Sequence, residues 1–209
     1  MYLDKTLQQY LDDLASAQPT PGGGSASALT GAMGASLACM VARLTVGKAD
    51  YTAVQQEIGD LIEQGEGLRA RFQELMRLDI EAYGKLSSCF KMPRETSEEK
   101  EARKQAVQGA LVEAALVPLE MVERALELVR CCKRVAEIGN KNVLSDIATA
   151  TSLALAAGNG AAWMVNVNIT SLKDADKAQE LQGRLDGALG QITEEALGVN
   201  RAIEERGAK

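Results

Sequence analysis

The chain has 209 residues, a formal net charge of −6 and no histidine. This length can bury one substantial core, and with 3% aromatic residues that core must be built from aliphatic side chains and methionine. The lack of histidine excludes histidine-ligated zinc and imidazole-based triads, and the acidic balance argues against nucleic acid as the main partner. Proton transfer would have to come from a carboxylate, lysine, tyrosine or thiol group. We expect one helical domain over 1–209.

Apolar residues recur at helical spacing along almost the whole chain, and no alternating strand pattern interrupts them. Thr96 and Glu99 have the spacing of a capping box at the start of one predicted helix, and Pro118 is expected to kink that helix. The expected helices cover residues 4–16, 26–45, 50–91, 96–138, 142–169 and 174–206. The sequence therefore predicts an all-α bundle of long antiparallel helices.

A glycine-rich turn, Pro21-Gly22-Gly23-Gly24-Ser25, leads into the second predicted helix, which is built mostly from small residues. Glycine lets the backbone approach a ligand or another helix closely, and the first N–H groups of the helix point toward any nearby anion. The same pattern also fits a loop and a tightly packed helix that bind nothing.

Asp79 interrupts an otherwise apolar stripe of the third predicted helix, formed with Phe72, Leu75, Met76 and Tyr83. Burial without a partner would raise the pKa of this carboxyl group toward the range useful for proton transfer. The alternative is a half-exposed Asp79 at the edge of the stripe, paired with Arg77 or Lys85.

Two stretches, 19–42 and 147–172, carry no formal charge. Each is long enough to cross a membrane. The polar and glycine residues within them, and the negative mean hydropathy of the chain, instead favour central helices of a bundle or of a dimer interface. The four cysteines lack Cys-x-x-Cys spacing and no signal peptide is recognisable, so we expect reduced thiols, a cytoplasmic protein and no membrane span.

Several short motifs, in this order and spacing, resemble the family of formiminotetrahydrofolate cyclodeaminase and methenyltetrahydrofolate cyclohydrolase. The resemblance extends from about residue 10 to about residue 172. The motifs are Pro21-Gly22-Gly23-Gly24-Ser25, Leu44-Thr45-x-Gly47-Lys48, Asp79-x-Glu81-Ala82-Tyr83, Met92-Pro93, Thr96-x-Glu98-Glu99-Lys100, Val117-Pro118-Leu119, Gly139-Asn140 with Ser145-Asp146, and Val165-x-Val167-Asn168-Ile169. Where the family often has another asparagine, this chain has Met164.

The resemblance implies an enzyme that closes or opens the 5,10-methenyl bridge of tetrahydrofolate, with no metal or cofactor beyond that substrate. It implies that Asp79 is the acid–base group and that the ligand is a tetrahydrofolate derivative, with or without a polyglutamate tail. From the small-residue helices themselves we expect a homodimer joined through them. The implied substrate-binding residues are Gly22, Gly23, Gly24, Ser25, Arg43, Lys48, Tyr83, Asn142, Asp146 and Asn168.

Other interpretations of these residues stay open at this point. Asp146 could simply favour the start of its helix, and Arg43 and Lys48 could serve only as cations at a helix C-terminus. Their functional interpretation is contact with the pterin ring for Asp146, Asn142 and Asn168, and with the folate carboxylates for the two cations. The other class of protein compatible with the sequence is a non-catalytic helical dimer that binds folate, another anionic metabolite or a partner protein.

Overall fold

The computed structural model describes residues 2–207, which form six α-helices, three short 3-10 turns and no strand within that range. The helices are α1 (Leu7–Leu14), α2 (Gly23–Arg43), α3 (Gln55–Phe90), α4 (Ser97–Ile138), α5 (Leu144–Thr170) and α6 (Ala175–Gly207). The 3-10 turns are η1 (Tyr2–Asp4), η2 (Ala49–Val54) and η3 (Lys141–Val143). The prediction of an all-α chain with six helices in this order is confirmed.

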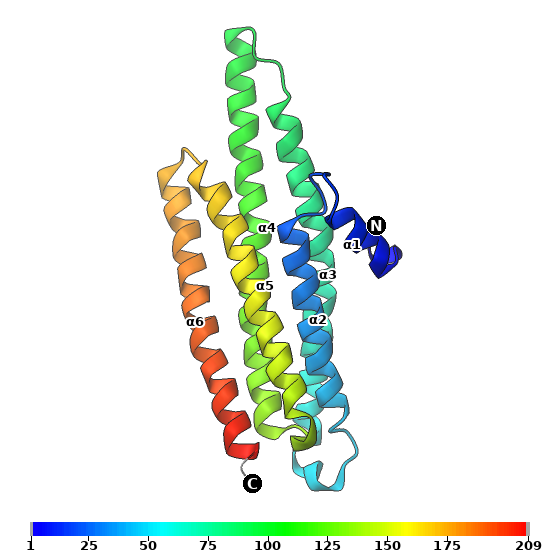
Figure 1. The fold of residues 1–209 in the computed structure, drawn as a ribbon. Helices are drawn as coiled ribbons and strands as arrows, with labels where there is room; N and C mark the ends of the chain where they lie inside the picture. The colour runs from blue at the N-terminus through cyan, green and yellow to red at the C-terminus, as the bar shows by residue number, and fades with distance from the viewer. Residues whose placement is uncertain (1, 208–209) are drawn as a thin grey trace.

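The five long helices run side by side along one axis (Figure 1). Helix α2 packs against α3 and α5, while α4 contacts α3, α5 and α6. The α3–α4 hairpin extends beyond the other helices at the upper end of the view, and the short α1 lies beside the upper half of α2 and α3. One buried apolar cluster has members on all six helices.

Small residues let α2 approach its neighbours closely within the chain. A Cβ atom added to Gly31 would lie 2.5 Å from the ring of Phe72 in α3, and one added to Gly34 would lie 3.0 Å from the carbonyl oxygen of Ala150 in α5. The small faces of α2 are therefore occupied by α3 and α5. Helix α2 is also long and apolar enough to cross a membrane, but 61% of its apolar window is buried inside the bundle, as is usual for a core helix.

Hydrogen bonds join the lower ends of α2 and α4. The backbone N–H of Asn140 donates to the buried Thr45 Oγ1 at 2.9 Å, and Asn140 Nδ2 donates to the carbonyl oxygen of Leu44 at 3.2 Å. This pairing connects the Leu44–Lys48 motif with the Gly139–Asn140 motif, and gives Thr45 and Asn140 a structural role.

Two local predictions for α4 can be compared with the structure. The capping box is present, because Thr96 accepts from the backbone N–H of Glu99 and the Glu99 side chain accepts from the backbone N–H of Thr96. Helix α4 continues through Pro118 without interruption.

Candidate functional site

A cavity of about 170 Å³ lies where the glycine turn before α2 meets α3, α4 and α5. Four separate parts of the chain line it, so the site depends on the packing of the bundle. The lining residues are Pro19, Thr20, Gly22, Gly23, Gly24, Asp79, Ala82, Tyr83, Leu86, Ala114, Met164 and Asn168.

Asp79 points from α3 toward the first turn of α2. A Cβ atom on Gly24 would lie 2.0 Å from Asp79 Oδ1, so the carboxyl group occupies the space that a side chain at position 24 would need. The backbone N–H of Ser25 donates to this carboxyl group. The glycine turn and Asp79 thus belong to one site. The sequence predicted each of them as a functional feature but did not predict their contact.

Burial raises the pKa of Asp79 to about 6, and the hydrogen bond from Ser25 opposes that rise. The cations that could have paired with Asp79 are engaged elsewhere. Arg77 pairs with Glu74 and Glu81, and Lys85 Nζ lies 3.0 Å from Glu113. The predicted alternative of a pairing with Arg77 or Lys85 is therefore wrong, although Asp79 does keep part of its surface exposed.

Tyr10 supports the glycine turn from α1. Its hydroxyl group lies 3.0 Å from Ser25 Oγ, and both side chains are buried. Burial raises the pKa of Tyr10, so the phenol stays neutral at physiological pH. The sequence placed Tyr10 on the apolar face of a short helix, and nothing in the spacing indicated that its hydroxyl would reach residue 25.

Asn168 and Tyr83 add further polar groups to the cavity, which Thr20 also lines. Asn168 Nδ2 donates to the carbonyl oxygens of Ala114 and Met164, each at 2.8 Å, which leaves the side-chain oxygen available to a ligand. Tyr83 is 44% exposed at the rim. Met164 was not predicted as a site residue, although its place one helical turn before Asn168 puts both on the same face of α5.

Four of the predicted substrate-binding residues lie at the other end of the bundle. Arg43 ends α2, some 20 residues or about 30 Å from the glycine turn, and its guanidinium group is 2.7 Å from Glu66. Lys48 follows α2 in an exposed segment, Asn142 is in η3, and Asp146 is in the first turn of α5. Within one chain these residues do not line the Asp79 cavity.

A second hollow, of about 250 Å³, lies between η1 and α3. Its walls are largely apolar, and its charged residues Lys5 and Arg77 are held in ion pairs with Asp13, Glu74 and Glu81. It offers no isolated acid–base group. We therefore take the Asp79 cavity as the functional site.

Three kinds of polar group surround this one cavity: a carboxyl group that can take up a proton near neutral pH, the N–H groups at the start of α2, and an amide oxygen. Such a cavity can bind a polar ligand and transfer a proton to or from it. Among residues 2–207 no group of three or more His, Cys, Asp or Glu side chains could hold a metal ion. The site is thus that of a helical, carboxylate-based enzyme or binding protein.

The family model described as formiminotransferase-cyclodeaminase matches residues 6–187. The chain is 40% identical over 202 residues to methenyltetrahydrofolate cyclohydrolase of Methylorubrum extorquens, a match that covers 97% of this chain and 95% of that protein. It is 28% identical to formimidoyltransferase-cyclodeaminase of Rattus norvegicus, covering 98% of this chain but 38% of that longer protein. The chain belongs to the formiminotransferase-cyclodeaminase family, which confirms the resemblance found in the sequence.

The fold agrees with this assignment. The crystal structure of formiminotetrahydrofolate cyclodeaminase from Thermotoga maritima superposes with a TM-score of 0.89 at 29% identity, covering 98% of each chain. The long-helix bundle described above is therefore also the fold of an enzyme of this family.

Proposed function

We propose that this enzyme of folate one-carbon metabolism acts as a methenyltetrahydrofolate cyclohydrolase, with Asp79 as its proton carrier. The observation that carries the proposal is the isolated Asp79 carboxyl group, whose pKa of about 6 suits proton exchange near neutral pH. The 40% identity to a cyclohydrolase over nearly the whole length of both chains supports this choice of reaction.

In the proposed reaction, water adds to the methenyl carbon between N5 and N10 of the cationic substrate. The Asp79 carboxylate accepts a proton from that water as the carbon–oxygen bond forms. The tetrahedral carbon then loses its bond to N5, the proton passes from Asp79 to N5, and the remaining hydroxyl proton leaves to solvent. The products are 10-formyltetrahydrofolate and one proton, so atoms and charge balance.

The cyclodeaminase reaction is the second candidate, favoured by the similarity to the Thermotoga maritima enzyme. N10 would attack the formimino carbon on N5, ammonia would leave with one added proton, and the same methenyl cation would form. The reaction again passes through a tetrahedral carbon beside an acid–base group, which Asp79 would supply.

The proposed ligand contacts follow from the cavity. The unpaired N–H groups at Gly23 and Gly24, in the turn from Gly22 to Ser25, would face the polar edge of the pterin. The Asn168 side-chain oxygen would accept from the ring amino group, and Tyr83 would cover the ring at the rim.

The absorbance of methenyltetrahydrofolate tests both reactions. Purified protein is added to methenyltetrahydrofolate, where we expect the near-ultraviolet band to decay faster than in buffer alone. It is added separately to 5-formiminotetrahydrofolate, where a rising band would identify a cyclodeaminase. An unchanged band in both assays would overturn the enzyme proposal in favour of a non-catalytic folate-binding or partner-binding dimer.

We further propose that catalysis needs no metal or nucleotide. The acid–base group that the reaction requires is already present in Asp79, and the chain has no histidine with which to ligate zinc. Dialysis against a chelator should leave the rate unchanged, whereas a loss restored by a divalent ion would contradict this proposal.

We also propose a cytoplasmic homodimer. The four cysteines are free thiols, which suits a reducing compartment. Because the small faces of α2 are occupied within the chain, the contact would use the outward faces of α2 and α5. Light scattering of the purified protein should give twice the mass of one chain, and fractionation of cells should place it with cytoplasmic markers.

A further inference from the structure

Asp79 serves α2 in the way that an N-cap side chain usually serves a helix. Helix α2 begins after Gly22, which has no side chain with which to accept from the free N–H groups of the first turn. The N–H of Ser25, the third residue of the helix, instead donates to the Asp79 carboxyl group from the middle of α3. In other helices a Ser, Thr, Asp or Asn at the N-cap commonly accepts from that N–H. The position of the first turn of α2 therefore decides how well this acid is hydrogen-bonded.

The Ser25 hydroxyl group has a different kind of partner from the other hydroxyl groups of α2. Those others donate to the carbonyl oxygen four residues earlier, and they belong to Ser27, Thr30 and Ser36. For Ser25 that carbonyl would belong to Pro21, which precedes the helix. The Ser25 side chain is fully buried, and its hydroxyl group lies 3.0 Å from the Tyr10 hydroxyl group. Without Tyr10, a buried polar group would be left unbonded, which is costly.

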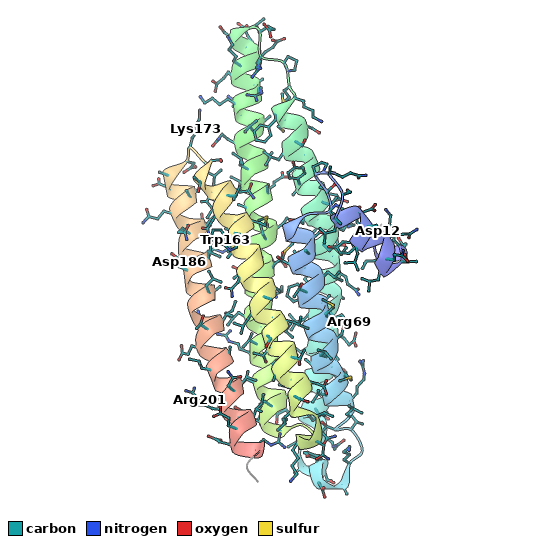
Figure 2. The ribbon with its side chains drawn as sticks, viewed as in Figure 1. Asp12, Arg69, Trp163, Lys173, Asp186 and Arg201 are labelled. Carbon is teal, nitrogen blue, oxygen red and sulfur yellow. The ribbon has the colours of Figure 1, made fainter. Side chains whose placement is uncertain are left out.

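Helix α1 is anchored to the bundle by Tyr10. It is the one buried residue of α1, whereas Leu7 and Leu11 are exposed, and Asp12 is exposed to the side of the bundle in Figure 2. Tyr2 of η1 packs edge-to-face on the Tyr10 ring, with 5.4 Å between the ring centroids and 84° between the ring planes. The N-terminal segment thus holds one hydroxyl group against the first turn of α2.

We propose that Tyr10 is a positioning residue, which acts through Ser25 Oγ to fix the first turn of α2 so that the Ser25 N–H stays directed at Asp79. Tyr10 does not line the cavity and does not touch the substrate. Its effect passes through the hydrogen bond from Ser25, which favours the ionised carboxylate over the neutral acid. This inference rests on the proposed function, and it adds the group that adjusts how readily Asp79 takes up a proton.

Few titratable groups face Asp79. The pKa of Tyr10 in α1 is raised by burial first and also by the Asp79 charge, and Tyr83 lies one turn farther along α3 at the cavity rim. Within residues 2–207 the other elements at the cavity contribute no titratable lining residue. Those elements contribute Pro19, Thr20, Gly22, Gly23, Gly24, Ala114, Met164 and Asn168. The hydrogen bond from Ser25 is therefore the contribution that a small displacement of the turn alters most.

The Y10F variant tests the proposal, because it removes the hydroxyl group and keeps the ring. We expect the acid limb of kcat/KM to move to higher pH by about 0.5 units, since the carboxylate loses part of its hydrogen bond. At pH 5 the rate should then be about threefold below wild type. An acid limb that stays in place or moves to lower pH would overturn the proposal.

The matched control is Y2F. The Tyr2 hydroxyl group lies beside Asp13 and not beside Ser25, and phenylalanine keeps the ring that packs on Tyr10. The acid limb of Y2F should coincide with that of wild type. Equal shifts in Y2F and Y10F would indicate a general effect of the N-terminal segment and would contradict the specific role of Tyr10.

Ser25 offers a second variant, which keeps the proposal testable if Y10F folds poorly. S25A removes the hydroxyl partner and retains the backbone N–H, so it should move the acid limb about as far as Y10F does. The double variant Y10F/S25A should move it no farther than either single change, because all three break the same link. Additive shifts would mean that the two residues act independently, and the proposal would be wrong.

A measurement without turnover separates this proposal from the proposed function. The carbon-13 resonance of the Asp79 carboxyl carbon, identified by its absence in D79N, reports the pKa of this group directly when the pH is varied. We expect a higher pKa in Y10F than in wild type and Y2F. That result with an inactive wild-type protein would sink the proposed function alone. The same pKa in all three proteins, with an active wild type, would sink the role of Tyr10 alone.

Discussion

Asp79 is the residue at which stability and function are opposed. Its carboxyl group is largely buried and has no cation beside it, and one backbone N–H only partly offsets the loss of water. Replacement by asparagine keeps the shape and removes the charge. We expect D79N to lower kcat by about 10²- to 10⁴-fold, the usual contribution of a positioned acid–base group, measured by the decay of methenyltetrahydrofolate.

The same variant should be the more stable protein at neutral pH. The folded-state pKa of about 6 exceeds the unfolded value near 3.8, so the folded state binds the proton more tightly. The protonated carboxyl group favours the folded state, and this contribution to the free energy of unfolding is lost as the pH rises from about 4 to about 6. Above pH 6 the ionised Asp79 destabilises the fold by its full amount. In urea unfolding, the free energy of unfolding of D79N should exceed that of wild type by up to about 3 kcal/mol at pH 8 and by little at pH 4. An equal difference at both pH values would contradict the buried, ionising Asp79.

The pH dependence of the rate follows from the same group. As a base, Asp79 is competent only when ionised, so kcat/KM should fall tenfold per pH unit below about 6 and level off above it. Burial raises the pKa of the neighbouring Tyr10 phenol, which therefore stays neutral through this range. An acid limb centred near pH 4 would show that the carboxyl group is solvated in the working enzyme.

At the scale of elements, the first turn of α2 and the middle of α3 fit together only because position 24 has no side chain. G24A would place a methyl group against the Asp79 carboxyl group, so we expect a loss of activity of at least about tenfold together with lower stability. G59A is the matched control. Gly59 also lies in a helix but has open space where a Cβ would stand, so alanine there should leave activity intact and raise stability by up to about 1 kcal/mol. Equal effects of the two changes would contradict the close approach at Gly24.

The limits of sequence-based prediction are visible in the same elements. Periodicity and the Thr96 capping box predicted the helices, because apolar spacing and caps are local properties. The Asp79–Gly24 contact and the hydroxyl pairing of Tyr10 depend on how distant helices pack, which spacing does not encode. The resemblance also grouped Arg43, Lys48, Asn142 and Asp146 with Asp79, whereas within one chain they lie at the other end of the bundle, because the order of motifs along a sequence does not encode their distance in the fold.

At the scale of the whole molecule, the outward face of α2 and α5 should decide the oligomeric state. W163E would put a charge on the outward face of α5, where Trp163 is 70% exposed, and we expect it to give monomers by light scattering while helix content by circular dichroism is retained. L197E is the matched control, since Leu197 is a 56% exposed apolar residue of α6 outside that face. A dimeric W163E protein, or a monomeric L197E protein, would place the contact elsewhere.

Trp163 is the only tryptophan of the chain, and it stands one residue before Met164, which lines the cavity. The intrinsic fluorescence of the protein therefore comes from one known position, at the border between the cavity and the outward face of α5. Contact between copies would shift its emission to the blue as water leaves the indole. A bound chromophore that absorbs in the near ultraviolet would quench the same emission by energy transfer. The unlabelled protein thus carries a single optical probe that distinguishes assembly from ligand binding in one titration.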